Sequence, residues 1–404
     1  MPIADFLIIG GGIIGLNCAR QLKRRYPDLT VTVIEKESGT GMHASGRNSG
    51  VLHAGFYYSP DSLKAKFTRI GNKELTEYCE FRKIFINRCG KLVVAKNVGE
   101  HAGLDELLRR GAANGIDLED ISEEEAKRIE PRVKTCERAI YSPKTSTVDP
   151  AKVLKSMTTD AVQEGVKIHC GVRYLKRTPD SILSTGGNYS AGYVVNAAGL
   201  YADHIAKDFG FSEKYKILPF KGLYLYSNEP VGSVRTNIYP VPDLKNPFLG
   251  VHVTVTAEGK AKIGPTAIPA FWREQYSGLD NFKVSELLDL TMRQANLFMF
   301  SGFDFKQLAV QEMKKYSRLH MVSLASSLME GVSQENYRTW GKPGIRAQLV
   351  DTERKKLEMD FVLEGDDRSM HILNAISPAF TCSIPFSDYV CDHIQKVYSK
   401  KQYD

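Results

Sequence analysis

Apolar and polar positions over the first fifty residues predict a strand, a helix and a second strand, in that order. Residues 6–9 form an apolar run (FLII) without helical periodicity, which is typical of a strand buried on both faces. A helix is expected at residues 13–25, and the run TVTVIEK at residues 30–36 predicts the second strand. The apolar N-terminus is interpreted as this first strand rather than as a signal peptide, because it carries Asp5 and lacks a basic region.

Glycines occupy the turn between the first strand and the helix, in the sequence GGGIIG at residues 10–15. Gly10 permits the tight turn, Gly12 lets the backbone approach a pyrophosphate, and Gly15 lets the helix pack close to the strand. The positive end of the helix dipole would face the phosphates. Glu35, at the end of the second strand, can accept hydrogen bonds from ribose hydroxyls and would repel a 2′-phosphate, which argues against NADP. The pattern predicts a dinucleotide site, and a phosphate-free βαβ unit with permissive glycines is the alternative.

Helical and strand patterns alternate over the next part of the chain. Helices are expected at residues 63–79, 100–129 (with a capping box at Ser122 and Glu125) and 151–164, and strands at residues 91–95, 166–172 and 193–199. The strand YVVNAAG is followed by a small-residue turn and a helix at residues 202–208, as at the N-terminus. We therefore expect it to join the same sheet.

From residue 217 to 265 the pattern changes to alternating β-rich segments, which predict an antiparallel sheet. Residues 284–330 have a helical pattern. Residues 346–361 and 370–375 return to strands, and a helix is expected at residues 387–398. The chain is therefore expected to be α/β, or α+β overall, with two discontinuous domains. The Rossmann-like domain would comprise residues 1–80, 145–215 and 335–404, and the mostly antiparallel one residues 81–144 and 216–334.

Composition and charge narrow the function classes. The chain has 404 residues, of which 42% are hydrophobic and 25% charged, as in ordinary globular proteins. Its net charge of +7 is spread along the chain, which does not indicate a nucleic-acid partner. Seven cysteines lie far apart without metal-ligand spacing, which favours a reducing, cytoplasmic compartment and no metal site. No apolar run of about 18 residues occurs, so no transmembrane helix is expected.

Several motifs together resemble the L-2-hydroxyglutarate oxidase/dehydrogenase family. They are GGGIIG, SGRNSGVLHAGFYY at residues 45–58, VNAAGLYAD at 195–203, PFKGLY at 219–224, YPVP at 239–242, LGVH at 249–252, IGPTA at 263–267, GIRAQL at 344–349 and SPAFTCS at 377–383. This family belongs to the FAD-dependent, D-amino-acid-oxidase-like superfamily. The resemblance implies FAD as cofactor, a Rossmann-like FAD-binding domain, and a substrate domain whose sheet covers the flavin.

The resemblance also implies which residues hold FAD. They are Gly10, Gly12, Ile14, Gly15, Glu35, Lys36, Ser45, Gly46, Arg47, Asn48, Ser49, Gly50, Val172, Ala198, Gly199, Gly344, Ile345, Ser377, Pro378 and Thr381. Small residues in this set permit close backbone approach, and Ser45, Asn48 and Ser49 supply hydrogen bonds. A polar helix cap would fit residues 45–50 as well. Many superfamily members have a glycine-rich motif where this chain has SPAFTCS, so the contacts of that segment stay open.

Oxidation of a 2-hydroxy acid requires a group that binds its carboxylate. Arg346 in GIRAQL is the leading candidate, because a guanidinium binds a carboxylate bidentately. A surface ion pair is the alternative. Lys221 and Tyr239 are candidates for a second, distal carboxylate, although Lys221 would also fit a strand surface. Tyr58 is a further candidate for substrate contact.

A base must accept the hydroxyl proton while the C2 hydrogen points at flavin N5. Histidine is the default, because its pKa lies near working pH. His252 in LGVH is preferred, since its strand is expected to face the flavin, with His53 in VLHAG as the second candidate. A structural role is the alternative for each. His371 is among the histidines expected to be structural or exposed.

The sequence therefore predicts FAD-dependent oxidation of a 2-hydroxy acid, L-2-hydroxyglutarate to 2-oxoglutarate, with electrons passing to oxygen or a quinone. A FAD-dependent amino-acid oxidase or deaminating dehydrogenase is one alternative, and a non-catalytic flavin- or nucleotide-binding module is another. Apolar and basic residues at 287–324 suit a membrane surface at the inner face of the cell membrane, or a helical pair packed on the substrate domain. The pattern favours the helical pair, and the oligomeric state is left open.

Overall fold

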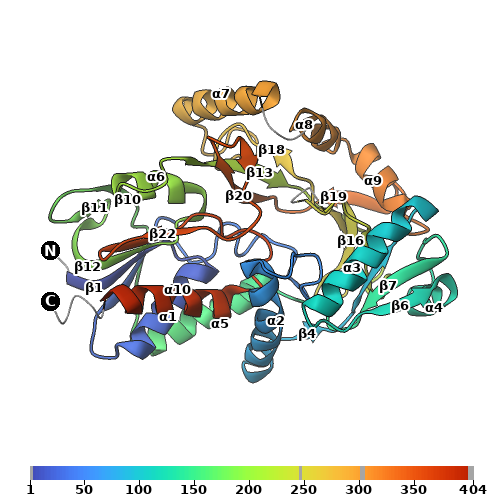
Figure 1. Cartoon of the computed structure of the whole chain (residues 1–404), viewed down its shortest axis with the longest axis horizontal. Coiled ribbons are helices and arrows are strands. Elements are labelled where there is room, and N and C mark those ends of the chain that lie inside the picture. The colour runs from blue at the N-terminus through green and yellow to red at the C-terminus, as the bar shows by residue number, and fades with distance from the viewer. Residues whose placement is uncertain (1–2, 245–247, 301–304, 399–404) are drawn as a thin grey trace. The chain divides into compact units, whose positions relative to one another are not determined.

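The computed structural model describes residues 3–244, 248–300 and 305–398 (Figure 1). Its chain divides into two compact units. The first unit comprises Met1–Asn48, Pro150–Pro219 and Arg346–Asp404, and the second comprises Ser49–Asp149 and Phe220–Ile345. Residues 49–80 thus fall in the second unit, whereas the sequence analysis placed them in the first. Helix α2 (Leu63–Phe81) is their main element, as the helical pattern there predicted.

The first unit is built on a sheet with a parallel centre. Its strands are β1 (Ile3–Ile9), β2 (Val31–Glu35), β9 (Lys167–Cys170), β10 (Tyr174–Arg177), β11 (Ile182–Ser184), β12 (Gly187–Asn196), β22 (Leu363–Gly365) and β23 (Ser369–Ile372). Strands β23, β12, β1, β2 and β9 follow one another in parallel, and β10, β11 and β22 add antiparallel pairs at the sides. The expectation that YVVNAAG joins the sheet of the N-terminal strand is confirmed.

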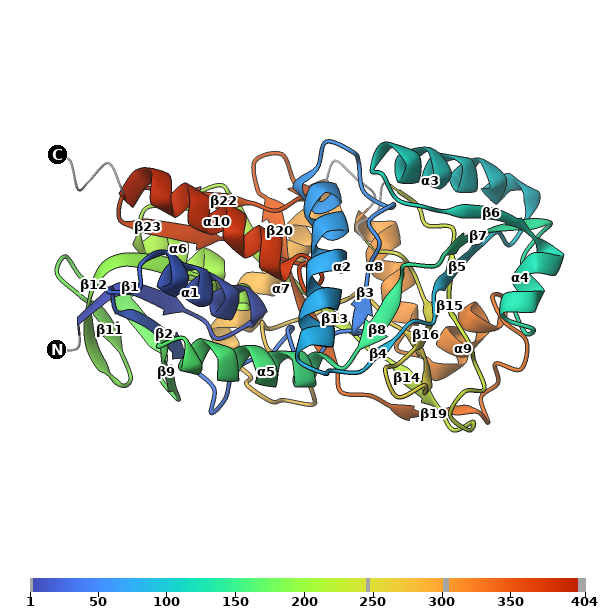
Figure 2. The same cartoon turned by 90° about the horizontal axis from the view of Figure 1, so that it is seen from below.

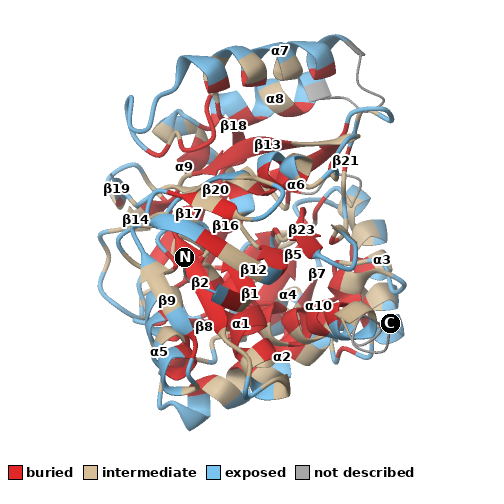
Figure 3. Ribbon diagram, turned by 90° about the vertical axis from the view of Figure 1, so that its left-hand side faces the viewer, coloured by how far each residue is buried: buried red, intermediate tan, exposed pale blue. Residues whose placement is uncertain are grey.

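Helices cover both faces of this sheet. Figure 2 shows α1 (Ile13–Arg25) between α10 (Ser383–Tyr398) and α5 (Pro150–Gln163), and α6 (Ala202–Asp208) packs on β12 and β23 from the other face. Helix α1 has the predicted bounds. Strands β1 and β2 are almost wholly buried (Figure 3), which explains their apolar runs without alternation.

The second unit contains a larger, mostly antiparallel sheet. Its order is β19-β14-β17-β16-β15-β5-β7-β6. The strands are β5 (Lys91–Val94), β6 (Glu119–Ser122), β7 (Arg138–Ser142), β14 (Leu225–Ser227), β15 (Asn237–Pro240), β16 (His252–Val255), β17 (Ala261–Gly264) and β19 (Tyr337–Trp340). Only the β15–β5 pair is parallel within this described sheet. The predicted antiparallel sheet is therefore confirmed, with one parallel pair that the sequence did not indicate.

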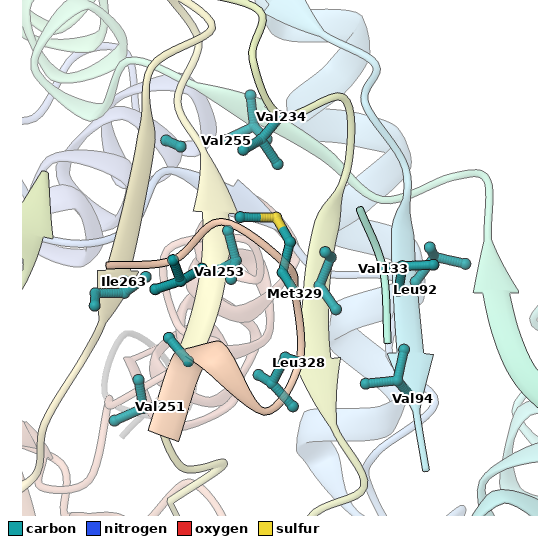
Figure 4. Packing of buried hydrophobic residues seen from close by; sticks show 14 of the residues in the cluster. Leu92, Val94, Val133, Val234, Val251, Val253, Val255, Ile263, Leu328 and Met329 are labelled. Carbon is teal, nitrogen blue, oxygen red and sulfur yellow. The ribbon is translucent and has the colours of Figure 1, made fainter. Parts of the chain in front are cut away.

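Side chains alternate between the two faces of this sheet. One face is apolar and packs Leu92, Val253 and Ile263 against Leu328 and Met329 (Figure 4). The residues next to these along each strand, which include Lys91, His252 and Lys262, therefore lie on the other face. A polar set on a buried face is unusual, and it marks this face as the candidate for chemistry.

Smaller elements complete the two units. A sheet of order β3-β8-β4 consists of β3 (Val51–Leu52), β8 (Ser146–Val148) and β4 (Ile86–Asn87). Another, of order β18-β13-β20-β21, consists of β18 (Ile268–Pro269), β13 (Tyr215–Gly222), β20 (Gly344–Asp351) and β21 (Lys356–Leu357). The residues of β13 and β20 fall on both sides of a unit boundary.

The second unit also contains α3 (His101–Ala113), α4 (Glu123–Ile129), α7 (Val284–Phe300), α8 (Phe305–Lys314) and α9 (Arg318–Ser326). The helical stretch predicted at residues 100–129 is interrupted between α3 and α4, because Gly115 has a left-handed φ of +65° and strand β6 follows. The predicted capping box is present, as the start of α4. Among the described helices, none is long and apolar enough to span a bilayer.

Candidate active site

The glycine turn at the start of α1 is shaped by close contacts that exclude side chains. Gly10 has a φ of +112°, and a Cβ there would lie 2.5 Å from the Ala197 carbonyl oxygen. A Cβ on Gly15 would lie 2.0 Å from the Gly10 carbonyl oxygen. These contacts agree with the expected roles of both glycines in the turn and in helix packing. Gly12 is the N-cap of α1, whose first turn has no acidic residue.

The Glu35 carboxylate is buried at the end of β2 and organises this turn. Its Oε2 accepts a hydrogen bond from the Gly11 amide at 2.7 Å, and its Oε1 accepts one from the Glu37 amide at 2.9 Å. The backbone carbonyl of Glu35 also accepts a hydrogen bond from Val172. Lys36 contacts Glu37 and the His43 ring. Each carboxylate oxygen can accept more than one hydrogen bond, so contact with a ribose stays compatible with this arrangement.

Residues 45–48 lie beside the start of α1. Ser45 Oγ accepts a hydrogen bond from the Ile13 amide at 3.0 Å, in the first turn of α1. Asn48 and Arg47 donate side-chain hydrogen bonds within the same loop, to the carbonyls of Ser45 and Met42. Gly46 has no room for a side chain, because a Cβ would lie 2.5 Å from the Gly41 carbonyl oxygen.

A second small-residue turn follows β12. The buried Asn196 side chain donates to the Ala202 carbonyl at 2.8 Å and accepts from the Ala198 amide at 3.2 Å. Its amide also contacts Nδ1 of the buried His371 at 3.1 Å, as expected of a structural histidine. Gly199 has a φ of +53°, with no atom within 4 Å of the position of a Cβ.

The segment before α10 lies in the same unit. Thr381 and Pro378 are buried, whereas Ser377 is exposed, and the Cys382 amide donates to the Pro378 carbonyl at 3.1 Å. Helix α10 packs along α1, and Ser387 Oγ donates to the Ile14 carbonyl at 3.3 Å.

These features fit FAD. Two turns of small residues expose backbone at the carboxyl ends of the neighbouring parallel strands β1 and β12, where doubly wound sheets bind dinucleotides. The N-terminus of α1 has the positive end of the helix dipole, which favours an anion such as a pyrophosphate. The open space beside Gly199 leaves room for a ligand.

The preferred base, His252, lies on β16 in the second unit and is 5% exposed. Its Nδ1 is 3.1 Å from the Gly250 carbonyl oxygen. A carbonyl can only accept, so Nδ1 donates in this contact, and in the neutral ring Nε2 then carries the lone pair. The Tyr239 ring stacks on the imidazole, with centroids 3.6 Å apart and planes inclined by 18°. The structure thus brings two of the predicted residues together.

His53, the second candidate base, lies near a buried lysine that the sequence analysis missed. Lys91 on β5 is fully buried, and its Nζ lies 4.7–4.8 Å from the ring centroids of Phe56, Tyr57 and Tyr239. This ammonium has no hydrogen-bond partner among the described residues, and burial lowers its pKa to about 7. Burial, and next the charge of Lys91, lower the pKa of His53 to about 3, so His53 is neutral at physiological pH.

Other predicted substrate contacts lie outside strands β15 and β16. Lys221 on β13 is buried, which lowers its pKa. Tyr58 is half-buried, and its carbonyl accepts a hydrogen bond from Asn114. Arg346, on β20, belongs to the first unit. Gly344 and Ile345 precede it in the second unit, as do Ser49 and Gly50.

Lys262 on β17 is a further missed residue, and it lies on the same sheet face as His252. The sequence gives only a partial signal for both lysines, because each is the single lysine of a short run, KLVV or AKIG, whose other residues are apolar or small. The strand pairing would have shown that these lysines share the face of His252.

Comparison with known proteins agrees with this fold. Residues 5–363 match the model of the family described as FAD dependent oxidoreductase. The chain is 36% identical over 417 residues to "L-2-hydroxyglutarate dehydrogenase, mitochondrial" of Homo sapiens, covering 97% of this chain and 89% of that protein. It is 34% identical over 409 residues to L-2-hydroxyglutarate dehydrogenase of Escherichia coli (strain K12), covering 98% and 94%.

Solved structures share the fold. L-alpha-glycerophosphate oxidase from Mycoplasma pneumoniae with FAD bound has a TM-score of 0.78 at 22% identity, covering 98% of this chain and 95% of that one. Glycine oxidase from Geobacillus kaustophilus has a TM-score of 0.74 at 19% identity, with the same coverage. The predicted α/β class and FAD-binding fold are confirmed. The chain therefore belongs to the L-2-hydroxyglutarate dehydrogenase family of FAD-dependent oxidoreductases, with FAD as its cofactor.

Proposed function

We propose that this protein oxidises L-2-hydroxyglutarate to 2-oxoglutarate with FAD. The observation that carries the proposal is 36% identity, over 97% of the chain, to an enzyme named for this dehydrogenation. The second unit supports it, because a buried sheet face with a histidine and two lysines suits an anionic substrate that must lose a proton.

The reaction removes the C2 hydrogen with two electrons and the proton of the hydroxyl group. When bound, FAD supplies the two-electron acceptor. The tautomer of His252 places a lone pair on Nε2, which can accept the hydroxyl proton, and the Tyr239 stack holds the ring in place. His53 is the alternative base. Its pKa of about 3 makes it the weaker one, so His252 stays preferred.

We propose that Arg346 binds the carboxylate next to the reacting carbon, since its fork can hold both oxygens. Lys221 or Tyr239 would bind a second carboxylate, with Tyr58 as a further contact. Burial of Lys221 supports the use of its charge, because a buried ammonium gains from an anionic partner. The FAD contacts assigned from the sequence, Gly10 to Thr381, are likewise proposals. The small-residue turns after β1 and β12 support them.

The electron acceptor is proposed to be oxygen or a quinone, and the location cytoplasmic or at the inner face of the membrane. Exposed Leu288, Met292 and Met299 on α7 support the quinone alternative, because apolar side chains favour a membrane surface. Leu290 and Leu297 on the same helix are buried, as expected of a helix packed on its own unit.

Anaerobic reduction tests the proposal. We expect the FAD-loaded protein to lose the visible absorbance of oxidised flavin, at about 450 nm, when L-2-hydroxyglutarate is added without oxygen. The absorbance is lost because the flavin keeps the two electrons. The D-enantiomer and L-glutamate are the controls. Bleaching by L-glutamate, with none by the hydroxy acid, would favour the amino-acid oxidase instead.

A further inference from the structure

Lys262 lies on the second unit's sheet, in register with the candidate catalytic residues. In the antiparallel pair of β16 and β17, Lys262 is directly opposite Thr254, and His252 is opposite Gly264. His252 and Thr254 share one face of β16, since Val253 and Val255 between and beyond them lie in the apolar core. Lys262 is therefore a diagonal neighbour of His252 on the same face.

The surroundings of Lys262 leave its charge poorly compensated. The residue is 4% exposed, and its Nζ donates one long hydrogen bond, of 3.3 Å, to the Ser49 carbonyl. Nζ also lies 4.5 Å from the Tyr224 ring centroid and 5.7 Å from that of Tyr226. Among the described residues no carboxylate forms an ion pair with it. Burial lowers its pKa to about 8, and the exposed Glu258 offsets this only in part.

Thr254 gives a second, independent indication of a ligand. Its side chain is fully buried, and its hydroxyl has no hydrogen-bond partner among the described residues. A buried hydroxyl and a buried ammonium, directly opposite each other and both short of partners, are costly to the folded protein. A carboxylate would satisfy both, because it accepts from an ammonium and from a hydroxyl at once.

We propose that Lys262, assisted by Thr254, binds the carboxylate of the substrate that is distal to the oxidised carbon, and so selects a dicarboxylic 2-hydroxy acid. The inference rests on the proposed oxidation of L-2-hydroxyglutarate, and it assigns the distal carboxylate to a residue other than Lys221 or Tyr239.

The spacing suits a five-carbon acid. Diagonal neighbours on adjacent antiparallel strands lie about 7 Å apart. Three carbon–carbon bonds separate C2 from the distal carboxyl carbon, which spans about 4 Å when extended. The hydroxyl oxygen, the carboxylate oxygens and the flexible lysine side chain span the rest of the distance between the two strand positions. A substrate whose hydroxyl meets His252 can therefore place its distal carboxylate at Lys262.

The alternative lysines fit this role less well. Lys91 is enclosed by the rings of Phe56, Tyr57 and Tyr239, so its charge is already directed at aromatic faces. Lys221 lies on β13, which belongs to a different sheet from His252.

Binding of glutarate and of pentanoate to the FAD-loaded protein tests the inference, by isothermal titration calorimetry. The two acids have the same chain length, and only glutarate has a second carboxylate. We expect Lys262→Met to weaken glutarate binding about 10- to 100-fold, the value of a charged hydrogen bond, and to leave pentanoate binding unchanged. In turnover of L-2-hydroxyglutarate, KM should rise more than kcat falls. Lys260→Met, an exposed lysine of the same hairpin, is the matched control.

Each outcome separates this inference from the proposed function. Unchanged glutarate binding in a folded, FAD-loaded Lys262→Met protein overturns the inference, even if L-2-hydroxyglutarate bleaches the flavin. Loss of glutarate binding in Lys221→Met alone also overturns it. Glutarate binding that depends on Lys262, in a protein that L-2-hydroxyglutarate does not bleach, overturns the proposed oxidation and the selection of a 2-hydroxy acid, and leaves Lys262 as the carboxylate site of another reaction. Should Lys262→Met fail to fold, Lys262→Gln and Thr254→Val serve in its place, with the same expectation for glutarate.

Discussion

His252 combines three features expected of a positioned base. It is almost fully buried, its Nδ1 is tied to the Gly250 carbonyl, and its ring is stacked on Tyr239. Burial excludes competing water, and the hydrogen bond sets the tautomer. The backbone of a neighbouring residue thus prepares this side chain for proton transfer.

Replacing this base should lower turnover without loss of the cofactor. We expect His252→Ala to reduce kcat for L-2-hydroxyglutarate by about 100- to 10,000-fold, the usual contribution of a general base. Steady-state kinetics and the flavin-to-protein absorbance ratio measure the two effects. His320→Ala on α9 is the control. Near-normal turnover of His252→Ala would exclude this role for His252.

Lys91 makes stability depend on pH. Its pKa is about 7 in the folded protein, against 10.5 for an ordinary lysine, so between these two pH values the unfolded chain binds more protons than the folded one. The free energy of unfolding of the protein therefore rises as pH increases from about 7 to about 10.5.

Lys91→Met removes this dependence. We expect the variant to be more stable than the parent at pH 7 and below, on the order of a few kcal/mol, because a buried, uncompensated charge is gone. The advantage should shrink as pH rises toward 10. Urea unfolding at pH 6, 8 and 9.5 measures the difference in unfolding free energy between the two proteins. A difference that does not change with pH would contradict the lowered pKa.

At the scale of elements, the turn between β1 and α1 depends on contacts that only glycine permits. The Gly10 carbonyl would lie 2.0 Å from a Cβ on Gly15, so any side chain there must push the helix away from the turn. The cofactor turn and the packing of the helix are thus a single structural feature.

Gly15→Ala should therefore affect stability and FAD binding together. We expect a loss of about 1–3 kcal/mol, as in other overpacked sites, and a purified protein with less bound FAD. Thermal unfolding and the flavin-to-protein absorbance ratio give the two readouts. Gly39→Ala is the control, because the atom nearest to a Cβ there is Met42 Sδ at 3.8 Å. Equal behaviour of the two variants would argue against this interpretation of the turn.

At the scale of the whole molecule, FAD binding should be linked to folding. A ligand that binds only the folded chain stabilises it by about 1.4 kcal/mol for each tenfold increase above its Kd. We expect Tm of the FAD-stripped protein to rise steadily with added FAD. Riboflavin should have a much smaller effect, since it lacks the pyrophosphate that the glycine turn is expected to hold. A Tm independent of FAD would contradict the cofactor assignment.

Local patterns predicted local structure well. The helix at residues 13–25 has the predicted bounds, because a glycine cap precedes it and its apolar spacing is regular. The capping box at Ser122 was also predicted, yet the strand before it was missed. Strand β6 is short, and its pairing with β7 depends on residues about twenty positions away.

The candidate site was predicted only in part. His252 and Tyr239 were named from motifs, and their stacking depends on the pairing of β15 and β16. Lys91 and Lys262 carry no motif, and each is a lysine in a short apolar strand. Their burial follows from the pairing of the sheet and from the packing of residues 49–57 in the same unit, which no short-range pattern encodes.

The sequence by itself determined the dinucleotide turn, since this depends on contiguous residues whose conformations are limited by glycine and by apolar periodicity. It indicated FAD and the family through the resemblance of its motifs. Only the tertiary structure decided that residues 49–80 belong to the second unit, and that two buried lysines share a sheet face with His252. Strand register places the two lysines on the face of His252, because a shift of one residue would turn each side chain to the opposite face. That register is set by contacts between segments far apart in the chain.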